Sequence, residues 1–240
     1  MQIEILYQDD DMLMVNKPAG ILVIPDRFNS DLPSLNRLLE SKLGHRIWVV
    51  HRLDRDTSGV MCFAKNEEMH RYLSQLFEAH DVGKFYAGIV MGRVLPEEGR
   101  IEAAIIEHPT QKGKMTTARK GKASVTDYKV VEQWALHSLV QFQIHTGRTH
   151  QIRVHMQSIG HPIVCDELYG DGKPFLLSTI KKKFKLSEKE ETERPLMSRL
   201  GLHAYRLMLH KPDSTLVDVE APLPKDMAAC VNQLNKWSKS

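Results

Sequence analysis

The segment His51-Arg52-Leu53-Asp54-Arg55-Asp56-Thr57-Ser58-Gly59 places two carboxylates, two guanidinium groups and a hydroxyl–glycine turn between two apolar runs. The runs cover residues 47–50 and 60–64. Apolar runs of this length, bounded by turn-forming residues, are typical of short buried strands. The charged segment is therefore predicted to be a loop held between core strands, where a rigid scaffold can display chemistry.

Asp54 is the carboxylate in this loop that lies between two arginines, Arg52 and Arg55. Positive charge within a few ångströms favours the ionised form of an acid, so Asp54 is expected to carry its charge at neutral pH. An ionised carboxylate suits nucleophilic work, not proton donation. A solvated turn with surface ion pairs is the simpler interpretation, and the charge density of the loop does not decide between the two.

The rest of the chain carries the decision, because the pattern of residues 51–59 resembles the nucleophile loop of the RluA family of pseudouridine synthases. Further segments match that family in the same order: Val15-Asn16-Lys17-Pro18-Ala19-Gly20, Lys84-Phe85-Tyr86-Ala87, Gly147-Arg148-Thr149-His150-Gln151-Ile152-Arg153-Val154-His155, His161-Pro162-Ile163 with Asp166, Tyr169 and Gly170, and Leu202-His203-Ala204. Together they extend over residues 5–223. One departure is Cys165, where the family usually has Gly before the Asp, so the local turn is the point to examine.

The predicted elements favour an α+β fold, because strands outnumber helices and do not alternate with them regularly. Strands are predicted at residues 3–7, 12–16, 47–50, 60–64, 84–90, 100–106, 125–132, 138–145, 202–209 and 215–219. Helices are predicted after Asn66, at 149–158 and at 224–237. The resemblance implies the pseudouridine synthase fold: a long, mixed, mostly antiparallel sheet with flanking helices and a central catalytic cleft.

Residues 1–240 are predicted to form one catalytic domain, with a charged surface insertion around residues 173–200. Many members of the family carry a small RNA-binding domain before the catalytic one. Here the entry motif lies within the first twenty residues, so no such domain is expected. RNA selection would then depend on the surface of the catalytic domain.

The resemblance implies a set of site residues for the isomerisation of uridine to pseudouridine. This reaction breaks the glycosidic bond, turns the base and rejoins it through carbon 5, after the base has left its stack. Asp54 would be the nucleophile and Arg153 the partner that pairs with it and holds it ionised. Tyr86 would be the stacking platform, worth about 1–3 kcal/mol per base, and its phenol could take the carbon 5 proton. Arg52 would enter the gap left by the flipped nucleotide.

Each of these residues also has a simpler interpretation. Tyr86 fits a plain core tyrosine, and Arg52 fits a surface ion pair. Arg153 fits a solvated helix arginine, although it flanks an apolar stripe of Ile152, Met156 and Ile159 from which it could reach a cleft.

The net charge of +3 is too mild to drive nucleic-acid binding by itself, so the distribution of charge matters more. Residues 111–123 contain five cations and no acid: Lys112, Lys114, Arg119, Lys120 and Lys122. Glycines at 113 and 121 make this a flexible basic loop. We predict that the loop contacts RNA phosphates, where each neutralised phosphate releases counterions, and that Arg148 makes a phosphate or structural contact. Ordinary solvated surface is the alternative for the loop.

Three scattered cysteines, Cys62, Cys165 and Cys230, argue for reduced thiols in a cytosolic protein. No apolar stretch has transmembrane length and no signal peptide is evident, so the protein is expected in the cytoplasm. We also expect a monomer that needs no metal and no cofactor.

Three other functions fit parts of the sequence. Asp54-Arg55-Asp56-Thr57 matches the aspartyl-phosphate phosphatase signature, but His51 and Arg52 interrupt the strand that this chemistry needs. A metal hydrolase is disfavoured because His150 and His155 are five residues apart and no HExxH occurs. An RNA-binding ribosome-assembly factor with an idle site stays as the alternative. The main prediction is an RNA pseudouridine synthase that acts on a stem-loop of 23S rRNA, tRNA or both.

Overall fold

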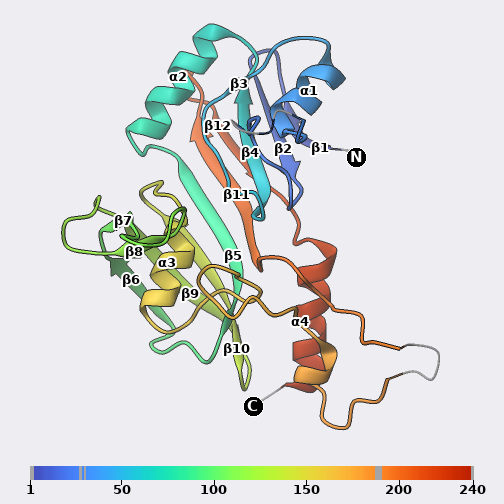
Figure 1. Ribbon diagram of the computed structural model, residues 1–240. Coiled ribbons are helices and arrows are strands. Elements are labelled where there is room, and N and C mark those ends of the chain that lie inside the picture. Colours follow the sequence, from blue (N-terminus) through green and yellow to red (C-terminus); the bar gives the residue numbers. More distant parts are fainter. Residues whose placement is uncertain (1–2, 27–28, 30, 187–190, 239–240) are drawn as a thin grey trace. The chain divides into compact units, whose positions relative to one another are not determined.

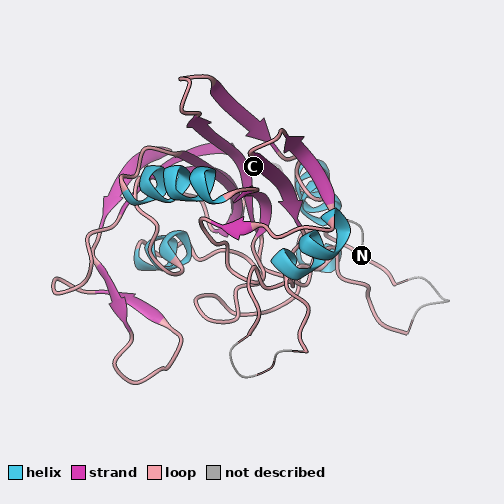
Figure 2. Cartoon of the chain, turned by 90° about the horizontal axis from the view of Figure 1, so that it is seen from above, coloured by secondary structure: helices cyan, strands magenta, loops and turns pink. Residues whose placement is uncertain are grey.

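The computed structural model describes residues 3–26, 29, 31–186 and 191–238 (Figure 1). Within them the chain forms four α-helices, one short 3-10 helix and twelve strands, which Figure 2 shows in cyan and magenta. The chain divides into two compact units. The first contains Met1–Tyr86 and His203–Pro222, and the second contains Ala87–Leu202 and Leu223–Ser240.

The first unit is built on strands in the order β1-β2-β4-β11-β5, with β3 added to β4 and β12 added to β11. Its strands and helices are β1 (Glu4–Gln8), β2 (Met12–Lys17), β3 (Trp48–Val49), β4 (Ser58–Ala64), β11 (Leu202–His210), β12 (Leu216–Glu220), α1 (Leu35–Leu43), α2 (Glu67–Glu78) and the start of β5 (Gly83–Met91). The pairs β1–β2, β2–β4, β3–β4 and β11–β12 are antiparallel, whereas β4 and β11 are parallel. The mixed sheet places the loop before β4 beside the start of β11.

Helix α2 covers this sheet because its apolar side chains recur at helical spacing. Leu73 is fully buried in a cluster with Met14, Cys62 and Leu207. The predicted start of the helix is confirmed, since the Asn66 side chain accepts a hydrogen bond from the Met69 backbone N–H at 2.8 Å. That bond satisfies one of the free amides of the first turn.

The second unit has strands in the order β5-β10-β9-β6 and a separate antiparallel hairpin, β7–β8. Its elements are the rest of β5, β6 (Glu98–Glu102), β7 (Ile105–Glu107), β8 (Met115–Thr117), β9 (Val125–Gln133), β10 (His137–Ile144), α3 (Gln151–Ser158), the 3-10 turn η1 (Leu177–Thr179) and α4 (Lys225–Trp237). Helix α4 packs Met227, Cys230 and Leu234 against Trp134 in one core cluster. The indole N–H of Trp134 donates to the Asn235 side chain at 2.8 Å.

The predicted α+β class and mixed, mostly antiparallel pairing are confirmed, and most predicted elements are present. Four details of the sequence interpretation were wrong. Residues 111–123, predicted to be a flexible loop, contain strand β8. The single strand predicted at 100–106 is two strands, β6 and β7, and helix α1 was not predicted. Ile159, assigned to the buried stripe of the 149–158 helix, is 38% exposed just beyond its end.

Cys165 adopts the conformation that a glycine would favour. Its backbone φ is +58°, in the left-handed region. The side chain is buried, and its Sγ lies 3.6 Å from the Met197 carbonyl oxygen. The turn therefore places a small buried side chain at a position whose backbone conformation favours glycine.

The one-domain prediction and the charged insertion around 173–200 stay predictions. Within that stretch Phe175, Ile180 and Met197 are buried, and Phe175 forms an isolated antiparallel bridge with Met197. Residues 187–190 of the expected insertion lie outside the described residues.

Candidate active site and RNA interface

A buried lysine holds the loop that carries Asp54 through hydrogen bonds to its backbone. Lys17, at the end of β2, has no exposed surface, and its ammonium donates to the carbonyl oxygens of Arg55 and Thr57 at 2.8 Å each and to that of Pro18 at 3.1 Å. The Thr57 backbone N–H donates to the Asp54 carbonyl at 3.2 Å, which closes a turn. A cation that binds main-chain carbonyls fixes the backbone of the loop without using the Asp54 side chain as its ligand.

The far end of the loop is held by a serine–histidine pair between β4 and β11. Ser58 Oγ lies 2.9 Å from His203 Nδ1, and His203 Nε2 lies 3.2 Å from the Ala221 carbonyl. A carbonyl only accepts, so Nε2 carries the proton and Nδ1 accepts from the Ser58 hydroxyl. Both side chains are buried. The neutral histidine thus connects the loop to two strands that are distant in sequence.

His51, at the start of the loop, is half-buried and accepts a hydrogen bond from the backbone. Its Nε2 accepts from the Cys62 backbone N–H at 2.9 Å, and its ring stacks on Phe77 with centroids 4.4 Å apart. Burial, with a smaller contribution from the Lys84 cation, lowers the pKa of His51 to about 3. The ring is therefore neutral at physiological pH, as acceptance from a backbone amide requires.

Tyr86 is buried on β5 in the same unit as Asp54. Burial raises the pKa of its phenol well above the ordinary value, and the negative charge of Asp54 raises it further. The phenol is therefore protonated at neutral pH, which favours stacking and hydrogen-bond donation over proton acceptance. Lys84 lies two residues earlier on the same strand and is also buried, which lowers its pKa. Arg52 is exposed.

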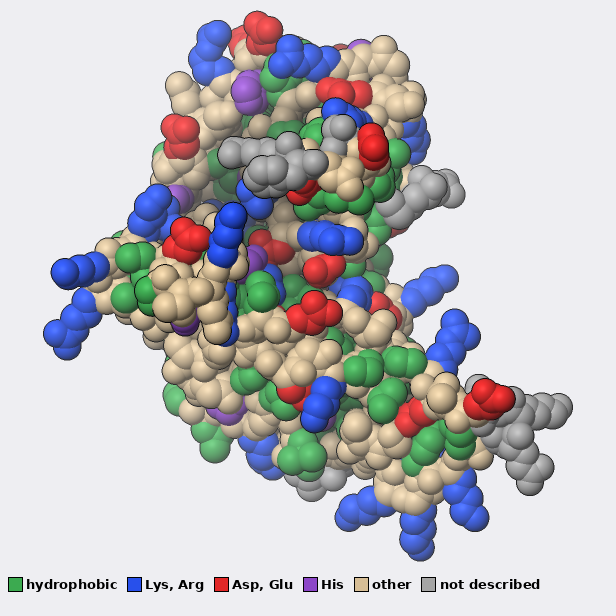
Figure 3. All heavy atoms as spheres, viewed as in Figure 1, with side chains coloured by type: hydrophobic (Ala, Val, Ile, Leu, Met, Phe, Trp, Pro, Cys, Tyr) green, Lys and Arg blue, Asp and Glu red, His purple; other side chains and the backbone are tan. Residues whose placement is uncertain are grey.

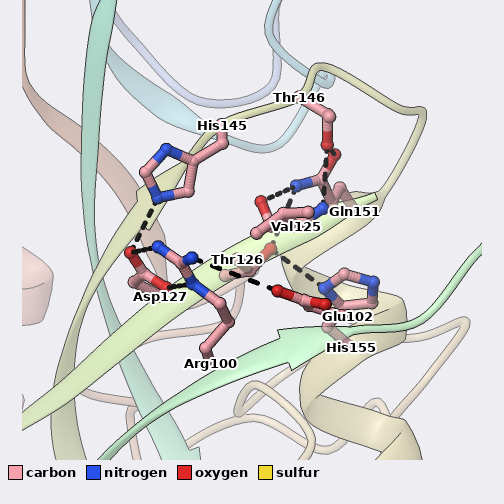
Figure 4. A network of polar contacts seen from close by, with 9 residues as sticks. All are labelled: Arg100, Glu102, Val125, Thr126, Asp127, His145, Thr146, Gln151 and His155. Atoms are coloured by element: carbon pink, nitrogen blue, oxygen red, sulfur yellow. Dashed lines mark hydrogen bonds and ion pairs between the residues drawn. The ribbon is translucent and has the colours of Figure 1, made fainter. Parts of the chain in front are cut away.

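In the second unit, a polar network fixes helix α3 against β9 (Figure 4). The Gln151 amide donates to the Val125 carbonyl and to Thr126 Oγ1 at 3.0 Å each, and its oxygen accepts from Thr146 Oγ1 at 2.7 Å. His155 contacts Thr126 Oγ1 through Nδ1 and the Ala103 carbonyl through Nε2, both at 2.9 Å. Gln151 and His155 are thus anchors of the helix on which Arg153 lies.

Arg153 forms a bidentate ion pair with Asp166, which belongs to the same unit. Its Nε and Nη2 donate to the two oxygens of Asp166 at 2.7 and 2.8 Å. Asp166 is fully buried, and Arg153 is 8% exposed. Two parallel charge-assisted bonds fix the plane of the guanidinium. The predicted pairing of Arg153 with Asp54, which lies in the first unit, stays a prediction.

The basic loop, residues 111–123, contains strand β8 of the β7–β8 hairpin. Figure 3 shows Lys and Arg side chains projecting from the surface in this region. Lys112, Arg119, Lys120 and Lys122 are exposed, whereas Lys114 is half-buried. A cavity of about 520 Å³ at the base of the hairpin is lined by Lys120, Lys122 and Arg148, among others. Arg148 also donates through Nε to the Ala123 carbonyl at 3.1 Å, and its contact with RNA stays a prediction.

The structure thus groups the predicted residues by unit. Asp54, Tyr86 and Arg52 belong to the first, and Arg153, Arg148 and the basic hairpin belong to the second. Sequence reasoning assigned no role to Lys17, His203, Gln151 or Asp166, although all four lie in the matched segments. Their signal is a charged or polar residue inside an otherwise apolar element, which indicates a buried polar partner.

Comparison with known proteins identifies the family. Residues 11–158 match the model of the RNA pseudouridylate synthase family, and the chain belongs to that family. It is 37% identical over 233 residues to the ribosomal large subunit pseudouridine synthase D of Neisseria meningitidis serogroup B, covering 95% of this chain and 60% of that protein. The protein of the same name from Pseudomonas aeruginosa is 37% identical over 231 residues, covering 94% of this chain and 70% of that protein.

Two solved human structures have the same fold. Human RNA pseudouridylate synthase domain containing 1 aligns with a TM-score of 0.74 at 28% identity, over 100% of this chain and 89% of that one. Human RNA pseudouridylate synthase domain containing 4 aligns with a TM-score of 0.72 at 27% identity, over 97% and 93%. The chain spans only 60% of the length of the Neisseria relative, so the relative's activity is not transferred to it directly.

Among the described residues, no helix has the length and apolar character needed to cross a membrane. In the same part of the chain, no group of three or more His, Cys, Asp or Glu side chains is placed to hold a metal ion.

Proposed function

We propose that this protein is an RNA pseudouridine synthase that isomerises specific uridines in structured RNA. The observation that carries the proposal is the fixed loop of Asp54: a carboxylate on a backbone held by Lys17, with a protonated Tyr86 close enough to feel its charge. A nucleophile needs such a fixed position relative to the base it attacks. Membership of the RNA pseudouridylate synthase family supports this reading.

In this mechanism the target uridine leaves its stack before chemistry begins. Arg52, exposed beside Asp54 in the loop, takes the place of the extruded nucleotide, and the ring of Tyr86 stacks on the base. Asp54 then attacks covalently, or stabilises and deprotonates the sugar cation, as the bond between the sugar and nitrogen 1 of the base breaks. The turned base re-forms the bond through carbon 5, the carbon 5 proton leaves to water, and nitrogen 1 takes up a proton in its place. Arg153 supplies positive charge that keeps the carboxylate ionised. No step requires a metal or a cofactor.

The substrate is proposed to be a stem-loop of 23S rRNA, with tRNA as a second substrate. The names of the Neisseria and Pseudomonas relatives support the ribosomal choice. The basic hairpin and the cavity lined by Lys120, Lys122 and Arg148 would bind its phosphates. We further propose that the enzyme works in the cytoplasm as a monomer.

The test is the Asp54→Asn variant, with Asp56→Asn as its matched control. Asp56 is an exposed acid two residues away in the same loop, so it controls for the loss of one negative charge. Asp54→Asn is expected to abolish pseudouridine formation, measured by carbodiimide labelling and primer extension, and to keep RNA affinity within a few fold. Asp56→Asn should stay active. Persistent turnover by Asp54→Asn would exclude the nucleophile role, and cellular function that survives without turnover would favour the alternative, an RNA-binding assembly factor.

A further inference from the structure

Tyr169 lies where three parts of the second unit meet, and its hydroxyl holds the basic hairpin. The residue is 3% exposed. The Met115 backbone N–H, at the start of β8, donates to the Tyr169 oxygen at 2.8 Å, and His150 Nδ1 lies 2.8 Å from the same oxygen. Met115 and Ile105, one from each strand of the hairpin, also pack in the apolar cluster of Tyr169. The hairpin is therefore tied to the residue both by its backbone and by apolar contact.

The ring of Tyr169 faces two cations with different roles. The guanidinium carbon of Arg153 lies 5.0 Å from the ring centroid, and the ammonium of Lys114 lies 5.7 Å from it. Both distances are within the range of cation–π attraction. Lys114 belongs to the basic loop and Arg153 to the site proposed for catalysis, so one aromatic ring is shared by the two.

Asp166 makes this assembly rigid. Its Oδ1 accepts from the Tyr169 backbone N–H at 3.1 Å and from the Leu168 N–H at 2.9 Å, and the same oxygen accepts from Arg153 Nη2. Tyr169 and Arg153 are thus fixed by a single buried carboxylate. Because the interior is close-packed, a displacement of the Tyr169 ring would also displace the Arg153 guanidinium.

We propose that Tyr169 is a positioning residue that couples RNA binding at the β7–β8 hairpin to the placement of Arg153. RNA phosphates that engage the cations of the hairpin fix β8, the hydroxyl of Tyr169 transmits that constraint from the Met115 amide, and the ring holds the guanidinium in its working orientation. The ligand that operates the coupling is a phosphodiester backbone. This inference rests on the proposed function, because it gives Arg153 a role in turnover.

The hydroxyl and the ring can be separated by two variants. Tyr169→Phe keeps the buried ring and removes the hydroxyl, with its hydrogen bonds to the Met115 N–H and to His150 Nδ1. It is expected to weaken the binding of an unmodified 23S stem-loop transcript about fivefold, since one lost hydrogen bond has roughly this effect, and to lower kcat less than the loss of the ring does. Tyr169→Leu also removes the ring and should lower kcat about tenfold as well. Tyr128→Phe, at another buried tyrosine of the same unit, is the matched control and should change neither.

Two measurements without turnover make the test independent of the proposed function. In Tyr169→Phe, hydrogen exchange at the Met115 amide should accelerate. In the wild type, the Arg153 Nε–H resonance should shift when the transcript binds, and in Tyr169→Leu this shift should be lost. An unchanged Met115 amide together with unchanged affinity would overturn the coupling, and so would an Arg153 shift that survives in Tyr169→Leu. Coupling without any turnover by the wild type would instead contradict the proposed function alone.

Discussion

Gly59 lies where the loop of Asp54 enters β4, and its backbone φ is +121°. A Cβ atom there would lie 2.1 Å from the carbonyl oxygen of Ala204 and 2.6 Å from its carbonyl carbon. These are main-chain atoms of the parallel partner strand β11, which cannot move aside without breaking the pairing. Only glycine fits this position.

Gly59→Ala is therefore expected to destabilise the protein by about 3 kcal/mol or more, because it combines backbone strain with a main-chain clash. Urea denaturation followed by circular dichroism measures the loss. Gly44→Ala is the matched control: φ is +75° there, but a Cβ atom would meet nothing within 4 Å. A cost for Gly59→Ala no larger than that of the control would contradict the close approach of the two strands.

His51 gives the stability of the protein a dependence on pH. Its pKa is about 3 in the folded protein and has its ordinary value of 6.5 in the unfolded chain. Between these values the unfolded chain binds a proton that the folded protein does not, so stability falls as pH drops from about 6.5 toward 3. His51→Gln can still accept from the Cys62 amide but does not titrate. The wild type should lose about 2 kcal/mol more than this variant between about pH 7 and about pH 5, measured by urea denaturation. Parallel losses would show that His51 does not titrate in this way.

At the scale of elements, β2 and the loop of Asp54 are joined by Lys17, whose ammonium satisfies three carbonyls. Lys17→Met keeps the length and apolar stem of the side chain and removes the charge. Because the carbonyls would be left without their donor inside the protein, we expect a loss of about 2–4 kcal/mol and a fall in turnover, since the loop loses its support. Denaturation and pseudouridine assays check both. Lys42→Met removes an exposed lysine with one bond to the Ile3 carbonyl and should cost far less. Equal costs for the two would argue against the support role.

Helix α3 shows a related division of labour along one motif. Gln151 and His155 hold the helix to β9, whereas Arg153 on the same helix turns to Asp166. The helix is short, so its position depends on these side-chain contacts more than on helix propensity. The contacts of Gln151 and His155 thus fix the helix, and the contact with Asp166 fixes the guanidinium of Arg153.

At the scale of the whole molecule, a net charge of +3 gives little general attraction for RNA. The proposed RNA binding would then depend on local clusters of cations, such as the one on the β7–β8 hairpin. Replacing Lys112, Lys114, Arg119, Lys120 and Lys122 with Gln should weaken RNA binding and flatten the plot of log affinity against log salt, because fewer counterions are released. Lys181, Lys182, Lys183 and Lys185 form a second basic run, for which phosphate contacts are also an open interpretation, and their change to Gln gives a comparison set that removes four positive charges. A salt slope that is unchanged by the first set would show that the hairpin makes no phosphate contacts.

The α+β class, most strand and helix positions and the Asp54 loop could be predicted from the sequence alone. The reason is that the spacing of apolar residues, the helix-capping residues and the turn residues are local signals. The sequence also indicated which residues to examine, through the order of the matched segments. The break between β6 and β7 escaped it, because only Ala103 and Ala104 separate the two strands and neither is a turn-forming residue. Helix α1 was missed although its sequence carries leucines at helical spacing, at positions 35, 38, 39 and 43.

The hydrogen-bond partners of the buried polar side chains become known only from the folded structure. Lys17 meets the carbonyls of Arg55 and Thr57, Ser58 meets His203, and Tyr169 meets Met115, each pair separated by 38 to 145 residues in sequence. No local pattern encodes such a pair, because a buried polar group needs a partner but does not specify where along the chain it lies. The chain alone therefore revealed the chemistry that Asp54 and Arg153 offer, and the fold revealed what holds their backbones and side chains in place.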